Sequence, residues 1–315
     1  MTSPLIPASF TVVLGLVMLV FGGELLIQQA SRLARRLGMT PFVIGLTIVA
    51  FGTSVPELFI SLTASLQGHP GIMIGNIIGS NIANVGLILG CCSLLAPLSF
   101  QFKKIRTELF IVLSASVIVM LCSRYGLFPR MVGILFVLTL LSYIFFTYLN
   151  HHNDQHTSKT DTKEQTMLSR IPAIILLMVV GLALLGLGST TFIQGAVTIA
   201  RYFDVSELVI GLTLAAVGTS LPELASSIAA LRQKQAGMLI GNVVGSNMFN
   251  LLMVLGLAGT ASPFSLEKAL LGRDLPIMFA YTAILVPMLH PGGEIKRWHG
   301  LVLLGSYIVY CLSLL

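Results

Sequence analysis

Long runs of hydrophobic positions, separated by short polar segments, follow one another along the whole chain. A helix of about 20 apolar residues can cross a hydrocarbon core of about 30 Å. Ten such runs are predicted, at approximately 8–31, 42–67, 72–97, 107–123, 129–149, 172–199, 208–231, 238–261, 272–290 and 299–315. We therefore predict an all-α polytopic membrane protein with ten transmembrane helices.

The composition agrees with this pattern and leaves little sequence for a soluble domain. Of the 315 residues, 55% are hydrophobic and 10% are charged, and the mean hydropathy is +0.93. Soluble domains have about 25% charged residues. The four cysteines, Cys91, Cys92, Cys122 and Cys311, show no CxxC spacing, which argues against disulfides and a zinc site. We expect packing roles for them and no cofactor.

The basic residues are distributed unevenly between the two sides of the predicted membrane helices. Alternate loops place 13 of the 18 on one side and five on the other: Arg32, Arg35, Arg36, Lys103, Lys104, Arg106, Lys159, Lys163, Arg170, Arg232, Lys234, Lys296 and Arg297 against Arg124, Arg130, Arg201, Lys268 and Arg273. The richer side should be cytoplasmic. In the cell (inner or plasma) membrane, both termini would then be extracytoplasmic. The net charge of +6 gives no support for nucleic-acid binding.

The chain contains an internal repeat. The segment "GTSVPEL" at Gly52–Leu58 returns as "GTSLPEL" at Gly218–Leu224, an offset of 166 positions. "IGNIIGSNIANVGLILG" likewise matches "IGNVVGSNMFNLLMVLG", and about half of the positions between Gly45 and Gly90 are identical to their partners. We predict a first repeat at 1–150, a cytoplasmic linker at 151–170 and a second repeat at 171–315.

Each repeat contains five predicted spans, so the second copy must enter the membrane from the opposite side. Arg35 on the basic side and its repeat partner Arg201 on the other side fit such an inversion. Inverted repeats with interrupted helices in matching positions are typical of secondary transporters, whose binding site lies near the bilayer midplane.

The repeated motif places Glu57 and Glu223 inside predicted spans. Ser54-x-x-Glu57 fits a capping box, and Pro56 suits a first helical turn. A helix that begins inside a span implies a break at membrane depth, which should free carbonyls near Val49 and Ala50. Such irregular backbone must be buried in protein or line a wet cavity.

Two carboxylates at this depth need a cationic partner, because each costs about 3 kcal/mol or more if unpaired. No span carries Lys or Arg at comparable depth, so a bound metal ion remains. The nearby side chains are hard oxygen donors: Thr53, Ser54, Glu57, Ser80 and Asn84, with Thr219, Ser220, Glu223, Ser246 and Asn250. Such ligands suit Ca²⁺, and subsets of them could hold Na⁺. For Gly75, Gly79, Gly241 and Gly245 close helix packing is favoured.

The paired "GTSxPE" and "GNxxGSNxxN" elements resemble the α1 and α2 repeats of the cation/Ca²⁺ exchanger superfamily, and most closely its prokaryotic sodium/calcium exchangers. The resemblance implies ten helices in two inverted halves, with four ion sites among spans 2, 3, 7 and 8. Spans 1 and 6 would slide against the rest. Glu57 and Glu223 would be the central calcium ligands, completed by the following groups: Thr53, Ser54, Ser80, Thr219, Ser220 and Ser246, with the carbonyls of Ala50 and Ala216.

One position departs from part of that family, in which several members carry aspartate where this chain has Asn250, the partner of Asn84. Two carboxylates balance one Ca²⁺ or two Na⁺. The expected function is antiport of Na⁺ against Ca²⁺ by a monomer that normally extrudes Ca²⁺. A proton/calcium antiporter, with Glu57 and Glu223 protonated on the return step, and a potassium-dependent cation antiporter stay open as alternatives.

Other function classes are disfavoured. An intramembrane hydrolase would need a general base beside "GTS", but all six histidines lie in loops or near span ends. A passive channel would not explain two matched broken helices. Glu24 has Thr190 as its repeat partner, and it is expected to face water or to be hydrogen-bonded; lining an ion path is the less favoured alternative. Glu108 and Asp274 are expected near Arg106 and Arg273 at the membrane interfaces.

Overall fold

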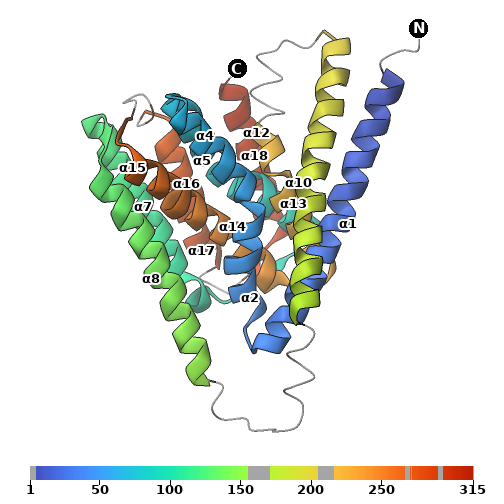
Figure 1. Cartoon of the computed structure of the whole chain (residues 1–315), viewed down its shortest axis with the longest axis horizontal. Coiled ribbons are helices and arrows are strands. Elements are labelled where there is room, and N and C mark those ends of the chain that lie inside the picture. Colours follow the sequence, from blue (N-terminus) through green and yellow to red (C-terminus); the bar gives the residue numbers. More distant parts are fainter. Residues whose placement is uncertain are drawn as a thin grey trace.

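The computed structural model describes residues 5–154, 171–204, 216–266, 270, 272–289 and 294–314, and helices make up nearly all of them (Figure 1). In the first half these are α1 (Leu5–Leu37), α2 (Pro41–Ile44), η1 (Gly45–Val49), α3 (Ala50–Thr53), α4 (Val55–Leu66), α5 (Pro70–Ala83), η2 (Asn84–Leu89), α6 (Gly90–Leu95), η3 (Phe102–Lys104), α7 (Arg106–Tyr125) and α8 (Arg130–Asp154). Within this series η1 and η2 are π-helical, and η3 is a 3₁₀ turn.

The described elements of the second half follow a similar order, with the two short helices α16 and α17 in the place of α7. Its helices are α10 (Ile171–Tyr202), α12 (Ala216–Thr219), α13 (Leu221–Arg232), α14 (Ala236–Met248), the π-helical η6 (Phe249–Leu255), α15 (Gly256–Ala261), α16 (Asp274–Ala283), α17 (Leu285–Leu289) and α18 (Arg297–Ser313). The π-helical segments η2 and η6 occupy equivalent places in the two halves.

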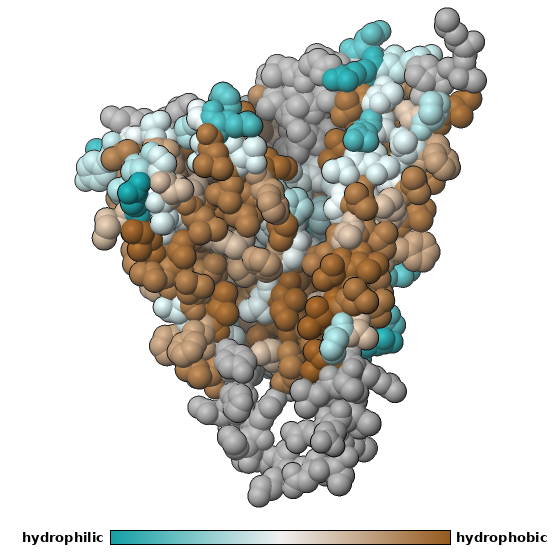
Figure 2. All heavy atoms as spheres, in the orientation of Figure 1, coloured by the Kyte–Doolittle hydropathy of each residue, from teal (hydrophilic) through white to brown (hydrophobic). Residues whose placement is uncertain are grey.

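Six helices within the described residues are long and apolar enough to cross a membrane: α1, α5–α6, α7, α8, α10 and α14–α15. A seventh span, Pro41–Thr53 with Val55–Leu66, is bent by 46° at its break. The predicted span at 208–231 starts outside the described residues, and the one at 272–290 consists of the short helices α16 and α17. The hydrophobic surface through the middle of the molecule fits a position among lipids (Figure 2).

The two longest helices, α1 and α10, lie side by side and antiparallel (Figure 1). Small residues spaced by seven bring their backbones together: Gly15 contacts Gly188, and Gly22 contacts Gly181. A Cβ atom on Gly188 would lie 3.0 Å from the carbonyl oxygen of Gly15. Because Gly15 and Gly22 are the repeat partners of Gly181 and Gly188, the two contacts are equivalents of one another.

Two short antiparallel ladders connect the halves. Strand β1 (Leu98–Ser99) pairs with β4 (Glu294–Ile295), and β2 (Leu127–Phe128) pairs with β3 (Phe264–Ser265). Each ladder joins one strand of the first half to one of the second, so main-chain hydrogen bonds link the halves at two places.

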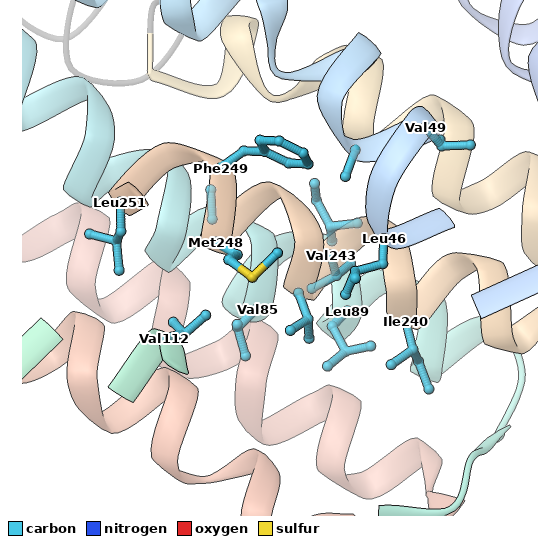
Figure 3. Close-up of a cluster of buried hydrophobic side chains, with 14 of the residues drawn as sticks. Leu46, Val49, Val85, Leu89, Val112, Ile240, Val243, Met248, Phe249 and Leu251 are labelled. Carbon is cyan, nitrogen blue, oxygen red and sulfur yellow. The ribbon is translucent and has the colours of Figure 1, made fainter. Parts of the chain in front are cut away.

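The buried core takes side chains from both halves around α14–α15, whose central 18-residue stretch is entirely buried (Figure 3). Gly241 and Gly245 permit this packing, since a Cβ on them would lie 2.3 Å and 2.4 Å from the carbonyl oxygens of Phe42 and Leu46. The packing role predicted for these two glycines is confirmed. For Gly75 and Gly79 no described atom lies within 4 Å of an added Cβ. The residues equivalent to Phe42 and Leu46 in the second repeat, at positions 208 and 212, lie outside the described residues.

Candidate functional site

The same helix break occurs once in each half. Helix α3 ends at Thr53 and α4 begins at Val55, with Ser54 between them at φ −84° and ψ 4°. In the second copy Ser220 separates α12 from α13 at φ −87° and ψ 2°. Glu57 and Glu223 therefore lie in the first turns of α4 and α13, where free backbone amides and the helix dipole favour a carboxylate.

The serine at each break does not cap the helix that follows it. Neither Ser54 nor Ser220 makes a side-chain capping hydrogen bond, so the capping-box interpretation of Ser54-x-x-Glu57 is wrong. The Ser54 hydroxyl instead donates to Oε1 of Glu223 at 3.3 Å. One copy of the motif thus supplies a hydroxyl to the carboxylate of the other copy.

The carbonyls expected to be free at the first break are engaged. Ala50 accepts the Ser54 amide at 3.0 Å and the Thr53 hydroxyl at 3.4 Å, and Val49 accepts the Thr53 hydroxyl at 3.1 Å. Pro56 instead deprives Gly52, four residues earlier, of its helical donor. The equivalent carbonyl of Gly218 accepts the Ser189 hydroxyl of α10 at 2.6 Å. Ala216 is the first residue of α12, and the structure describes its backbone only.

Buried oxygen atoms without hydrogen-bond partners gather at this site. Glu57 and Glu223 are each 1% exposed. Within the described part of the chain, 11 buried side-chain polar atoms lack a partner, and nine of them belong to the two motifs: Glu57 Oε2, Ser80 Oγ, Asn81 Oδ1, Asn84 Oδ1, Thr219 Oγ1, Ser220 Oγ, Glu223 Oε2, Ser246 Oγ and Asn250 Oδ1. Buried polar groups are normally paired, so this concentration points to a ligand that the oxygens share.

Asparagine amides connect the two copies. Asn84 donates to Oδ1 of Asn247 at 2.9 Å, and the Thr53 hydroxyl donates to Oδ1 of Asn242 at 3.3 Å. Nδ2 of Asn242 in turn donates to the hydroxyls of Ser226 and Ser227, each at 3.1 Å. Asn242 and Asn247 were not among the predicted site residues. The signal for Asn242 was its spacing, because it lies four residues before Ser246 on the same helical face.

The chemistry of the site suits a hard cation. Neither Glu57 nor Glu223 forms an ion pair within the described residues; the ion pairs found there are Arg232–Glu24 and Arg273–Asp274. The two motifs supply carboxylate, hydroxyl and amide oxygens, and the Ser54 hydroxyl of one copy contacts the Glu223 carboxylate of the other. Six to eight such oxygens at 2.3–2.6 Å are what Ca²⁺ takes, and they include no soft ligand that would favour a transition metal.

The remaining predicted polar residues lie away from this oxygen cluster. Glu24 pairs with Arg232 at 2.5 Å, and Asp274 pairs with Arg273 at 3.0 Å, as expected. Glu108 accepts a hydrogen bond from Tyr143 at 2.5 Å and shows no ion pair with the expected neighbour, Arg106, within the described residues. All four cysteines are free thiols.

Comparison with known proteins gives consistent matches over the full length. The sequence model of the family described as sodium/calcium exchanger protein matches residues 8–149 and again 173–315. The sodium/calcium exchanger MaX1 of Methanosarcina acetivorans is 34% identical, with 96% of each chain covered. The putative antiporter CaxA of Alkalimonas amylolytica is 36% identical, with 96% of this chain and 97% of CaxA covered. The solved structure of the sodium-calcium exchanger NCX_Mj soaked with 10 mM Na⁺ superimposes with a TM-score of 0.84 at 30% identity, covering 99% of this chain and 100% of that one.

Proposed function

The chain belongs to the sodium/calcium exchanger family, and we propose that it exchanges Na⁺ for Ca²⁺ by alternating access and normally extrudes Ca²⁺. Membership of this family makes it a multi-pass membrane transporter rather than an enzyme. The observation that carries the finer proposal is that nine buried side-chain oxygens without a hydrogen-bond partner among the described residues belong to the two motifs, with Oε2 of Glu57 and Oε2 of Glu223 among them.

The proposed mechanism is competition for one set of ligands. Ca²⁺ or two Na⁺ would each neutralise the two carboxylates, whereas the empty pair would leave two buried charges unpaired. Such a state costs several kcal/mol in a protein interior. The carrier therefore rarely passes through the occluded state without bound ions. The penalty couples outward movement of one ion to inward movement of the other. An inward sodium gradient then expels calcium.

Ten membrane spans in two inverted repeats form the proposed architecture. Two observations support it: the family model matches once in each half, and contacts occur in repeat-related pairs. Asn76 donates to Ser61 at 3.0 Å, and their partners Asn242 and Ser227 are bonded at 3.1 Å. We propose that α1 and α10 move together against the other helices, with the termini extracytoplasmic and the central linker cytoplasmic.

The ligand assignment extends to the remaining predicted groups. We propose that Thr53, Ser54, Ser80 and Asn84 act with Thr219, Ser220, Ser246 and Asn250 around the two glutamates. The carbonyl of Ala50 would contribute the lone pair that accepts the long 3.4 Å bond from Thr53, because the Thr53 hydroxyl also has the Val49 carbonyl as an acceptor at 3.1 Å. The carbonyl of Ala216 would contribute its second lone pair.

The decisive test is ⁴⁵Ca²⁺ uptake into proteoliposomes loaded with Na⁺ and diluted into Na⁺-free medium. Uptake should require internal Na⁺, and Glu57→Ala or Glu223→Ala should abolish it without preventing membrane insertion. Glu294→Gln, a carboxylate outside the site, serves as the control. Wild-type-like flux in either alanine variant would refute the ligand assignment.

The same assay separates the two alternatives. Uptake driven by a pH gradient in the absence of Na⁺ would identify a proton/calcium antiporter in which Glu57 and Glu223 carry the protons. Dependence on K⁺ together with Na⁺ would identify a potassium-dependent exchanger. Uptake that only runs down the calcium gradient would identify a channel.

A further inference from the structure

A cavity of about 970 Å³ lies at the end of the molecule where α7 and α14 begin. Its wall also includes Thr40–Val43, at the start of α2, and four residues of α8: Thr139, Tyr143, Phe146 and Thr147. The distribution of basic residues makes this end the cytoplasmic one. None of the oxygens around Glu57 and Glu223 lines the cavity, so it is a different place from the proposed ion site.

The polar groups of this cavity include charges of both signs. Lys104 and Lys234 line it and are exposed, whereas Glu108 lines it and is 7% exposed. Tyr143 donates its hydroxyl to Oε1 of Glu108, and Oε2 has no hydrogen-bond partner among the described residues. Two ammonium groups at the rim and one carboxylate farther in are complementary to a zwitterion with its anionic part outward.

The helices around the cavity favour an anion at the same rim. Both α7 and α14 present their first residues to it, including Thr107, Ala236 and Gly237. Amide groups and the positive end of the dipole at a helix N-terminus attract phosphate. Basic pockets between membrane helices on the cytoplasmic side are known lipid headgroup sites. A phosphate group therefore fits beside Lys104 and Lys234.

A separate apolar groove of about 420 Å³ lies farther along the same helices and shares no described lining residue with the cavity. It is lined by Thr47, Ile48 and Phe51 on one side and by Leu141 and Ile144 of α8 on the other. These positions lie about a turn or more farther from the cytoplasmic end than Val43 and Thr147. The Thr47 hydroxyl, the polar side-chain group there, donates to the carbonyl of Val43 at 2.7 Å. The groove therefore offers an acyl chain an apolar surface.

We propose that this cavity and groove bind one aminophospholipid of the cytoplasmic leaflet. The phosphate lies between Lys104 and Lys234, the primary ammonium group donates to the carboxylate of Glu108, and one acyl chain follows α8 through the groove. A choline headgroup has no N–H to donate, and a glycerol headgroup has no cation. Phosphatidylethanolamine therefore matches all three features of the site, while phosphatidylcholine and phosphatidylglycerol each miss one.

The test is lipid binding to the delipidated full-length protein, followed by native mass spectrometry. Phosphatidylethanolamine, phosphatidylcholine and phosphatidylglycerol with identical acyl chains are titrated separately. Wild type should bind phosphatidylethanolamine at least tenfold more tightly than phosphatidylcholine. Glu108→Gln should remove that preference, and Glu108→Asp should keep part of it. Unchanged melting temperature and elution volume confirm that the variants are folded.

Three further variants assign the parts of the lipid. Lys104→Gln with Lys234→Gln should weaken binding of phosphatidylethanolamine and phosphatidylcholine alike, because both carry the phosphate. Leu141→Trp should weaken binding of all three lipids by filling the groove. Lys103→Gln, whose side chain is exposed and does not line the cavity, should change nothing.

Several outcomes would overturn the proposal. Equal affinity of the wild type for phosphatidylethanolamine and phosphatidylcholine would remove the role of Glu108. Tighter binding of phosphatidylglycerol would make this an anionic-lipid site, and equally strong binding of soluble phosphoethanolamine would remove the role of the groove. If none of the three lipids binds, the cavity and groove are not a lipid site at all. Because the readout is lipid binding, failure of the proposed ion exchange would not alter these results.

Discussion

Asn242→Ala tests how the two copies of the motif depend on each other, because one side-chain amide there contacts both broken helices. Its Oδ1 accepts the Thr53 hydroxyl of the first break at 3.3 Å. Its Nδ2 donates to Ser226 and Ser227 of α13 at 3.1 Å each, and to the carbonyl of Glu223 at 3.5 Å. The substitution removes all of these contacts without changing any charge.

The expected magnitude follows from the partners left behind. Thr53 keeps its bond to the Val49 carbonyl at 3.1 Å, and Ser226 keeps its bond to the Glu223 carbonyl at 3.0 Å. Ser227 loses the Asn242 amide. With a net contribution of about 0.5–1.5 kcal/mol for each hydrogen bond, we expect a loss of about 2 kcal/mol in stability. The Thr53 hydroxyl has one proton to share between Val49 and Asn242, so losing Asn242 leaves it turned toward Val49. We expect this change to weaken ion binding by about 1.4 kcal/mol, or roughly tenfold.

Flux and melting temperature together test this estimate. Asn242→Ala should raise the Na⁺ concentration for half-maximal ⁴⁵Ca²⁺ exchange about tenfold. The matched control is Asn76→Ala, because Asn76 is the repeat partner of Asn242 but is only partly buried and donates to Ser61 at 3.0 Å. Its effect should be about threefold or less. An Asn242→Ala variant with wild-type Na⁺ dependence, or an equal defect in both variants, would refute the reasoning.

The remaining predictions concern α1 and α10, which we propose to move, and the residues that we propose as ion ligands. Gly188→Ala should slow exchange while equilibrium Ca²⁺ binding stays normal, because a Cβ there would lie 2.9 Å from Cβ of Met18. The control is Gly186→Ala, since no described atom lies within 4 Å of an added Cβ at Gly186. Equal flux in the two variants would contradict the prediction. Ser54→Ala should lower Na⁺ affinity about fivefold, about 1 kcal/mol, by removing the hydroxyl from Glu223; unchanged Na⁺ titration of ⁴⁵Ca²⁺ exchange would argue against that contact. Reversing one charge of the Glu24–Arg232 pair should change the transport rate only a few-fold, since both side chains are partly exposed and such pairs contribute about 1 kcal/mol or less. Reversing both charges should restore the rate. If the rate is not restored, direct pairing of the two side chains is excluded.

The sequence predicted the positions of the broken helices because they recur at a constant offset. A proline and a carboxylate inside an apolar run are visible without any tertiary information, and their repetition excludes a chance interruption. The backbone confirms this, since Ser54 and Ser220 adopt nearly identical dihedral angles. The grouping of the motif oxygens is a property of the fold and depends on how α5 and α14 pass the two breaks.

What the sequence could not predict were choices between local and distant partners. Ser54 has a local sequence suited to capping, yet its hydroxyl donates to Glu223, 169 positions away. Glu108 has a basic neighbour two residues earlier, yet its partner is Tyr143 on α8. The carbonyl that Pro56 leaves without a helical donor could have been identified from sequence alone. A proline removes the donor of the residue four positions earlier, which is Gly52.

The two short ladders also determine what the folding unit of this protein is. Each strand pairs only with a strand of the opposite half, Leu98 with Ile295 and Leu127 with Ser265. A half synthesised alone would leave the main-chain groups of both of its strands without partners, and unpaired strand edges promote association with other chains. The repeat is therefore a unit of sequence, whereas the strands of each half depend on the other half for their main-chain partners.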